Sequence, residues 1–234
     1  MKLDFGSPLE PGKEDGLKRL QVLEKIHPIN FKNGLDLGAG KGAYSFLLST
    51  KVEKLFCTDI QKEYVRGISL NGNKNIFSFV SSAKNIPLES ESMESVFCIE
   101  VLDHVKDLSG TISEIKRITK RGGHVFVSAP NKYFPIETHH VYFGKKRFDG
   151  RFVPIVCMFD FIHEKIGSAR RFSRKNLTEL FTEHGFALIS CDYFSLPFDN
   201  FILGRLLIKP LTEFLIKTPL KVFSPTLIAV FKKV

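Results

Sequence analysis

The sequence predicts an α/β protein built on a doubly wound, mostly parallel sheet with helices on both faces. Two observations carry this prediction. Over the first 130 residues, short apolar runs alternate with longer segments of helical periodicity, a pattern typical of βα units. A glycine-rich turn from Gly38 to Gly42 also follows the first predicted strand and opens a helix.

The elements of this first part follow from the spacing of their apolar residues. In chain order they are a helix over Gly16–Ile26, a strand over Gly34–Leu37, a helix over Gly42–Leu48, a strand over Lys54–Asp59, a helix over Gln61–Leu70, strands over Ile76–Ser81 and Ser95–Ile99, a helix over Leu108–Ile118 and a strand over His124–Ser128. The segment Arg121 to Gly123 is expected to form the turn into the last of these strands.

Beyond Pro130 the periodicity is lost for about forty residues, where aromatic and basic side chains mix. We expect one domain over residues 1–234 with two insertions, at about 131–171 and 199–223, because long structureless connections are unusual in a compact domain. Ser173 is suited to cap a helix that runs to Gly185. Strands are predicted over Ala187–Tyr193 and Thr226–Phe231.

Composition excludes several classes of protein. A hydrophobic content of 43% with 25% charged residues is ordinary for a globular chain. The first 16 residues lack the apolar run of a signal peptide, and charged residues and a proline interrupt the most apolar stretch, 201–223. Cys57, Cys98, Cys157 and Cys191 show no paired spacing and are expected to be reduced. We therefore expect a cytoplasmic protein, with peripheral contact to a membrane left open.

The net charge of +9 is unevenly distributed. Residues 1–130 carry 18 Lys and Arg against 16 Asp and Glu, a net +2, whereas residues 131–234 carry 16 against 9, a net +7. A basic surface of this kind favours anionic partners, such as phosphorylated molecules, anionic lipid or nucleic acid, and is equally compatible with a solvated face.

The glycine-rich turn predicts a site for a nucleotide-like ligand. Gly38 and Gly40 allow the backbone to approach a ligand closely, and with Ala43 they also fit the dinucleotide-binding pattern. Asp36 precedes these glycines and would repel a pyrophosphate, whereas it would attract the cationic amine and sulfonium groups of S-adenosylmethionine.

Together with four further stretches in the same order, this turn resembles the class I S-adenosylmethionine-dependent methyltransferases, which have a Rossmann-like fold. The stretches are Asp59 at the end of its strand, Ser81 to Pro87, Phe97 to Val105 and Arg121 to Asn131. The resemblance covers roughly residues 17–130. It implies a seven-stranded sheet with the last strand antiparallel, and S-adenosylmethionine as the cofactor.

The resemblance also implies roles for individual residues. The first motif would lie along the methionine and ribose parts of the cofactor, Asp59 would accept hydrogen bonds from both ribose hydroxyls, and Ser82 stands where the family commonly has an aspartate beside the adenine amino group. The cofactor-binding residues expected on this basis are Asp36, Gly38, Ala39, Gly40, Asp59, Ile60, Ser82, Ala83, Glu100 and Val101.

On the acceptor side the sequence leaves the general base open. His104 follows the fourth predicted strand, and Glu137, His139, His140 and Arg171 lie in the first insertion, so these five are the candidates for the acceptor pocket, with Glu137, His139 or His140 as a possible base. A metal site is not expected, because adjacent histidines cannot share one face of a regular element and the sequence shows no second cluster of ligands.

The sequence therefore predicts methyl transfer to an O, N or C nucleophile of a small-molecule or lipid-like acceptor. A nicotinamide-dependent (NAD(P)) oxidoreductase and a non-catalytic binding protein of the same fold are the alternatives. The aromatic and basic insertions suit an apolar acceptor or a membrane surface at least as well as nucleic acid, for which no binding module is visible. A homodimer interface remains open.

Overall fold

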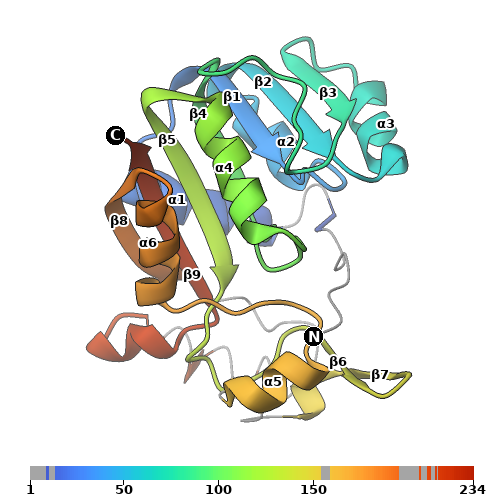
Figure 1. Ribbon diagram of the computed structural model, residues 1–234, viewed down its shortest axis with the longest axis vertical. Coiled ribbons are helices and arrows are strands. Elements are labelled where there is room, and N and C mark those ends of the chain that lie inside the picture. The colour runs from blue at the N-terminus through green and yellow to red at the C-terminus, as the bar shows by residue number, and fades with distance from the viewer. Residues whose placement is uncertain are drawn as a thin grey trace.

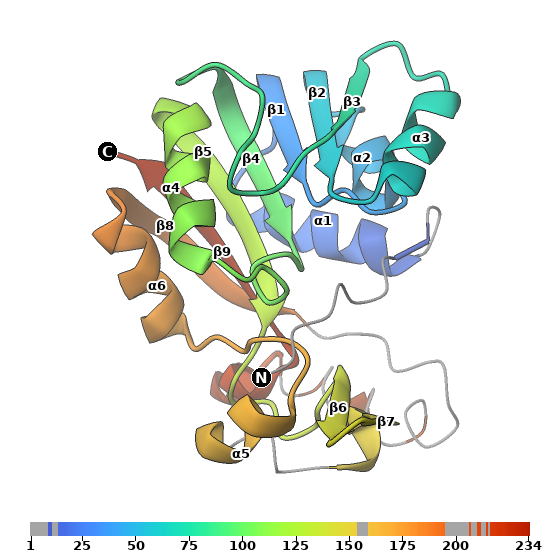
Figure 2. The ribbon, with the colours of Figure 1, turned by 45° about the vertical axis from the view of Figure 1, so that its right-hand side comes forward.

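In the computed structural model, seven strands form one central sheet with helices packed against both of its faces (Figure 1). The structure describes residues 9–10, 14–153, 159–194, 206, 210–211, 214 and 216–234. A separate two-stranded hairpin and a short helix lie beyond one end of the sheet, as Figure 2 shows from a second direction. This arrangement confirms the predicted fold class.

The strand order of the sheet is β3-β2-β1-β4-β5-β9-β8. The first five strands pair in parallel, whereas β9 runs antiparallel between β5 and β8. The last strand of the chain is therefore the antiparallel one, as expected. Because the chain leaves β1 toward β2 and leaves β4 toward β5, the order reverses between β1 and β4, and a crevice opens at their carboxyl ends.

The elements agree with the predicted ones in type and order. The helices are α1 (Glu14–Ile26), α2 (Ala43–Leu48), α3 (Lys62–Leu70), α4 (Leu108–Ile118), α5 (Asp160–Ile166) and α6 (Arg174–Glu183), with short 3-10 helices η1 (Gly150–Phe152) and η4 (Pro219–Phe223). The strands are β1 (Phe31–Leu37), β2 (Val52–Asp59), β3 (Ile76–Val80), β4 (Met93–Ile99), β5 (Thr119–Pro130), β6 (His140–Phe143), β7 (Lys146–Asp149), β8 (Phe186–Phe194) and β9 (Thr226–Lys233).

Side chains of the central strands alternate between two cores, one on each face of the sheet. On β4, Val96 and Cys98 pack with α4 and α6, whereas Phe97 and Ile99 pack with α1, α2 and α3. Phe181 of α6 stacks on Phe231 of β9 with ring centroids 4.1 Å apart, and both rings are fully buried. These two layers hold the carboxyl ends of β1 and β4 in fixed positions.

One expected turn is wrong. The segment Arg121 to Gly123 lies inside β5, which begins at Thr119 directly after α4. Gly122 has a φ of 77°, and the pairing with β4 shifts between Met93 and Ser95. The glycines thus form an irregularity within a strand, because pairing with β4 resumes on both sides of them.

The first expected insertion contains regular structure that the lost periodicity did not reveal. Strands β6 and β7 form the hairpin, and α5 joins it through a bridge between Val141 and Gly167. Of the second expected insertion, 199–223, most residues lie outside those described, and so does Cys157. Cys57, Cys98 and Cys191 are free thiols.

The carboxyl end of β5 is tied to the last part of the chain. Asn131 is fully buried, and its side-chain amide donates hydrogen bonds of 2.7 Å to the backbone oxygens of Val222 and Ser224. Ser173 caps α6 as predicted, accepting a hydrogen bond from the backbone N–H of Asn176. In the part of the chain that is described, no helix has the length and apolar character needed to cross a membrane.

Replacing Phe181 by alanine should lower the free energy of unfolding by about 3–5 kcal/mol, because the stacked ring leaves a cavity between α6 and β9 that the surrounding core cannot close. Urea denaturation of the purified variant measures this change. Phe77→Ala is the control, since 46% of that ring is already exposed, and it should cost less than about 1 kcal/mol. Equal losses would contradict the assignment of Phe181 to the core.

Candidate active site

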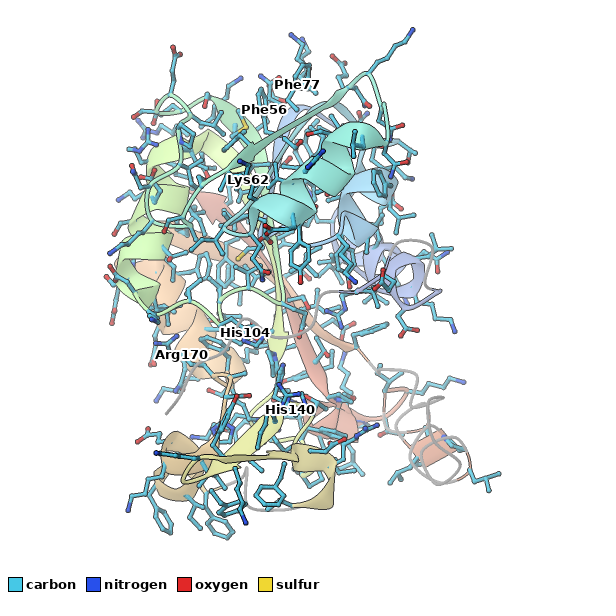
Figure 3. The ribbon with its side chains drawn as sticks, turned by 90° about the vertical axis from the view of Figure 1, so that its right-hand side faces the viewer. Phe56, Lys62, Phe77, His104, His140 and Arg170 are labelled. Atoms are coloured by element: carbon cyan, nitrogen blue, oxygen red, sulfur yellow. The ribbon has the colours of Figure 1, made fainter. Side chains whose placement is uncertain are left out.

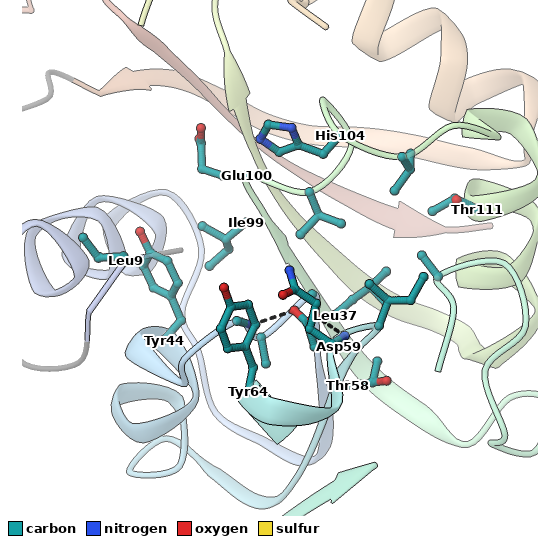
Figure 4. A pocket seen from close by; sticks show the side chains of 18 of the residues that line it. Leu9, Leu37, Tyr44, Thr58, Asp59, Tyr64, Ile99, Glu100, His104 and Thr111 are labelled. Atoms are coloured by element: carbon teal, nitrogen blue, oxygen red, sulfur yellow. Dashed lines mark hydrogen bonds between the residues drawn. The ribbon is translucent and has the colours of Figure 1, made fainter. Parts of the chain in front are cut away.

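A cavity of about 840 Å³ opens at the carboxyl ends of β1, β2 and β4, where the strand order reverses. The start of the chain forms one side, where Leu9 and Glu10 contribute, and the hairpin segment Thr138 to His140 closes the far end. Figure 4 shows Asp59 and Thr58 on one side of the cavity and Glu100 and His104 on another. Its volume is in the range of a cofactor site with room for a second small molecule.

The glycine-rich turn forms the wall between β1 and α2. The backbone N–H groups of Gly38 and Ala39 both donate to the oxygen of Thr58, at 2.8 and 2.9 Å, and tie the turn to β2. Gly38 has a φ of 70°, and a Cβ atom there would lie 2.6 Å from Cγ2 of Val101. Only glycine fits at this position, because both the backbone angle and the close approach of the β4 loop exclude a side chain.

Asp59 stands at the end of β2 with its carboxylate facing the turn. Its Oδ2 accepts a hydrogen bond from the backbone N–H of Gly40 and its Oδ1 one from Gln61, both at 2.9 Å. A carboxylate has about four acceptor positions, so two remain for hydroxyl groups of a ligand. This geometry fits the expected contact with two ribose hydroxyls.

Asp36 differs from the expectation. Its carboxylate is 2% exposed, accepts a 2.6 Å hydrogen bond from the hydroxyl of Ser45, and is not among the described residues that line the cavity. Burial raises the pKa of Asp36 to about 7, although the Ser45 hydrogen bond opposes the shift. The full negative charge that the sequence argument assumed is therefore only partly present at neutral pH, and Asp36 acts on the site from beneath the turn.

A buried ion pair crosses the cavity between α1 and β4. The Arg19 guanidinium lies 2.8 Å from Oε1 of Glu100, and Ser128 of β5 donates a hydrogen bond to the same oxygen at 2.5 Å. Burial opposes the charge of Arg19, but Glu100, together with smaller contributions from Tyr44, Asp103 and Asp15, outweighs it and raises the pKa of Arg19. Glu100 has a φ of 56°, an unusual conformation for a residue other than glycine, at the point where β4 enters its loop.

Ser82 and Ala83 line the side of the cavity next to β3, as expected. The hydroxyl groups of Thr58 and Ser81 lie 2.7 Å apart beside them. The backbone oxygen of Ser82 accepts a hydrogen bond from Asn85, which folds the segment into a tight turn. Nine of the ten expected cofactor-binding residues thus line one cavity, and Asp36 is the exception.

Acidic and imidazole groups gather at the opposite end. His104, His139 and His140 line the cavity, and Asp103 lies behind them with no exposed surface. Nε2 of His104 is 3.1 Å and Nε2 of His139 is 3.6 Å from Oδ2 of Asp103. Burial raises the pKa of Asp103 to about 6, while the charge of His104 acts to lower it. In Figure 3, His104 lies at the end of the sheet and His140 beyond it, at the start of the hairpin.

Glu137 and Arg171 lie behind this group rather than in the cavity wall. Burial alone would raise the pKa of Glu137, but hydrogen bonds from His139 and His163 outweigh it and hold the pKa far below its usual range. Nε2 of His163 is 2.8 Å from Oε2 of Glu137. Arg171 donates to the backbone oxygens of Asn131 and Phe134, at 2.6 and 2.5 Å. Glu137 therefore joins two segments of the insertion, and Arg171 ties the end of the insertion to its start, directly after β5.

The positions of the acidic and imidazole groups also affect the expectation that no metal binds here. Ligand atoms of Asp103, His104 and His139 lie within 4.8 Å of one another. The sequence argument relied on the lack of a second ligand cluster near the adjacent histidines. Folding brings Asp103 and His104, which follow β4, next to His139. The lack of a second ligand cluster is therefore no longer a reason to exclude a metal.

The sequence analysis missed Arg19 and Tyr44, which line the cavity from α1 and α2. The guanidinium of Arg19 lies 6.0 Å from the centre of the Tyr44 ring. One signal was available, because Arg19 lies next to the buried Leu20 and four residues before the buried Leu23 on the inner side of α1. An arginine in that position must find a partner or a ligand.

The described residues fit S-adenosylmethionine. The turn leaves its backbone open to the cavity, Asp59 retains two acceptor positions, and Arg19 provides a buried cation of the kind that binds a carboxylate. When bound, this cofactor supplies an electrophilic methyl group on a sulfonium. The chain would hold the ribose at Asp59 and the carboxylate at Arg19.

Asp36→Asn should stabilise the protein at pH 8 and lose this advantage near pH 4. The pKa of Asp36 is raised when the protein folds, so the folded state binds the proton more tightly and wild-type stability falls as the pH rises from about 4 to about 7. A shift of this size corresponds to about 4 kcal/mol. Urea denaturation at both pH values measures it, and a difference independent of pH would contradict the assignment.

Binding of S-adenosylhomocysteine and of 5′-methylthioadenosine should separate the two ends of the site. Asp59→Ala should weaken both ligands by about 10–100-fold, because both carry the ribose. Arg19→Gln should weaken S-adenosylhomocysteine to a similar degree and methylthioadenosine far less, because the latter lacks a carboxylate. Calorimetry measures each affinity.

Cys57→Ala is the control for these variants, since Cys57 is buried in the same strand as Asp59 and does not line the cavity among the described residues. It should leave both affinities within about threefold of wild type. If Cys57→Ala and Asp59→Ala had equal effects, the ribose assignment would be wrong.

Comparison with known proteins bears on the domain type and on the fold. Residues 35–127 match the family model described as a methyltransferase domain. A crystal structure of an S-adenosylmethionine-dependent methyltransferase from Mesorhizobium loti matches with a TM-score of 0.65 at 15% identity, covering 94% of this chain and 99% of that one. One from Aquifex aeolicus matches with a TM-score of 0.60 at 16% identity, covering 95% and 94%.

Curated relatives match over a shorter stretch. The ubiquinone biosynthesis O-methyltransferase of Vibrio atlanticus is 28% identical over 117 residues, which is 48% of this chain and 49% of the relative. That of Paracidovorax citrulli is 27% identical over 134 residues, or 55% and 56%. The chain thus spans about half the length of the curated relatives it matches. Residues 35–127 are thus similar to methyltransferase domains, and the solved structures show that the chain shares the Rossmann-like fold of these proteins.

Proposed function

We propose that the protein transfers the methyl group of S-adenosylmethionine to a hydroxyl oxygen of a small, apolar or lipid-like acceptor. One observation carries the proposal: a single cavity connects the ribose-type carboxylate Asp59 with the imidazole groups of His104 and His139. The names of the relatives, which are O-methyltransferases, agree with an oxygen acceptor.

Transfer to a hydroxyl requires an approach in line with the sulfur–carbon bond and a place for the proton. A lone pair of the acceptor oxygen forms the new bond to the methyl carbon, and the electron pair of the broken bond stays on sulfur, which becomes neutral. The hydroxyl proton passes to an imidazole nitrogen of the cavity wall. His104 and His139 are the described groups placed to accept it.

The buried carboxylates prepare these histidines. Burial lowers the tendency of His139 to be charged, but its contact with Glu137 and the charge of Asp103 outweigh it, so the pKa of His139 is raised. A base with a raised pKa holds an acquired proton more firmly. Asp103 lies beside both histidines and would stabilise either of them as an imidazolium.

Two alternatives predict different ligands. A nicotinamide-dependent oxidoreductase would show saturable binding of the reduced nicotinamide cofactor in a fluorescence titration. A non-catalytic binding protein would bind S-adenosylmethionine and transfer no methyl group to any fraction of a cell extract. The partly charged Asp36 beneath the turn and the Glu100 carboxylate in the cavity wall both disfavour a pyrophosphate.

Methyl-labelled S-adenosylmethionine, incubated with separated lipid, RNA, protein and small-molecule fractions, should label the lipid or small-molecule fraction. His104→Gln and His139→Gln, combined in one variant, should slow this labelling by about 100-fold or more, because the proton acceptors are lost. The affinity for S-adenosylhomocysteine should stay within about threefold of wild type. His27→Gln is the matched control, because His27 lies against His124 and does not line the cavity among the described residues. Labelling of RNA or protein alone would contradict the proposed acceptor.

A further inference from the structure

The tip of the β6–β7 hairpin combines exposed aromatic and basic side chains. The sequence there is Phe-Gly-Lys-Lys-Arg-Phe, from Phe143 to Phe148, and contains no acidic residue. The phenylalanine rings are 49% and 45% exposed, and Lys145, Lys146 and Arg147 are exposed as well. Large apolar side chains held in water at a turn cost free energy unless they meet a partner.

The two rings of the tip form one apolar unit. Phe143 and Phe148 pack edge to face with centroids 5.7 Å apart. Phe148 pairs across the hairpin with Val141, which is buried and bridges to Gly167 at the end of α5. The pair is therefore fixed to the body of the insertion by its own strands and is not a loose loop end.

A second pair of exposed aromatic rings lies at the start of α5, next to the hairpin. Phe159 is 50% and Phe161 is 65% exposed, and their centroids are 6.4 Å apart. In Figures 1 and 2, α5 and the hairpin both lie beyond the carboxyl edge of the sheet, at the same end of the molecule. We call the four phenylalanines with Lys145, Lys146 and Arg147 the aromatic-basic end.

The exposed charge of the aromatic-basic end is positive, because the carboxylates of Asp149 and Asp160 are already paired with cations. Asp149 is bound by Arg151 through both carboxylate oxygens, and Asp160 is paired with Lys132 at 2.5 Å. Among the residues that the structure describes, none forms an ion pair with Lys145, Lys146 or Arg147. An anionic partner would thus meet three cations beside the exposed rings.

We propose that the aromatic-basic end docks on the surface of an anionic lipid bilayer. Phenylalanine rings partition into the boundary between headgroups and acyl chains, and neighbouring lysines and arginines bind the anionic headgroups. A second copy of the chain would bring the same three cations against each other. Single-stranded RNA stacks successive bases on ring faces, whereas both ring pairs are edge to face, so neither pair offers two parallel faces for successive bases.

Docking in this orientation would also give an apolar acceptor access to the cavity. Strand β6 begins at His140, which lines the cavity, and reaches Phe143 three residues later. An apolar acceptor dissolved in the bilayer would then reach His139 and His140 over a short distance. This last step rests on the proposed function, whereas the docking itself does not.

Sedimentation of the full chain with lipid vesicles tests the proposal. The chain should bind vesicles of phosphatidylglycerol and phosphatidylcholine and bind pure phosphatidylcholine far more weakly. Lys145→Gln with Lys146→Gln should weaken binding to the anionic vesicles by about 30-fold, since each basic residue contributes about fivefold near such a surface. Phe143→Ser with Phe148→Ser should weaken it at every salt concentration, whereas added salt should weaken the wild type strongly.

Lys74→Gln with Phe77→Ser is the matched control, because both residues are exposed and Phe77 lies at the opposite end of the molecule, as Figure 3 shows. It should bind vesicles like wild type. Calorimetry with S-adenosylhomocysteine, without vesicles, should give one affinity for all variants and so reports on the proposed function separately. The proposal is overturned if wild type does not sediment with anionic vesicles, if the control loses binding equally, or if the tip variants lose RNA binding or dimerisation instead.

Discussion

The reversal of strand order between β1 and β4 is the constraint on which the site depends. Neighbouring parallel strands whose connections leave in opposite directions cannot cover their own carboxyl ends, so a crevice remains between them. The glycine-rich turn lies on one side of this crevice and Glu100 with Val101 on the other. The close packing of Gly38 against Val101 shows how narrowly the two sides approach.

Ionisable side chains within the crevice fix one another's positions by ion pairing and hydrogen bonding. Arg19 and Glu100 are paired across it, and Ser128 adds a hydrogen bond from a third element. A buried pair of this kind gains little net stability, because desolvation of both charges offsets their attraction. The Arg19–Glu100 pair instead fixes the positions of a cation and an acid on the cavity wall.

The end of the cavity that holds the histidines is assembled differently, from a strand end and an insertion. Asp103 and His104 follow β4, whereas His139 and Glu137 belong to the segment before β6, and His163 comes from α5. Glu137 connects the segment before β6 with α5, because His139 and His163 both contact its carboxylate. Any movement of the hairpin and α5 would therefore move His139 relative to Asp103, so the surface of the insertion and the chemistry of the cavity are mechanically linked.

Local patterns determined the fold class and the order of the elements, because hydrophobic periodicity and glycine spacing are properties of neighbouring residues. Nine of the ten residues that the resemblance assigned to the cofactor line one cavity. Tertiary structure alone decided what depends on distant segments. It placed Asp36 beneath the turn with a raised pKa, brought Arg19 from α1 to Glu100, made Arg121 to Gly123 part of a strand, and gathered Asp103, His104 and His139 at one end of the cavity. Burial and contacts between separate elements set these outcomes, and no short-range pattern in the chain encodes them.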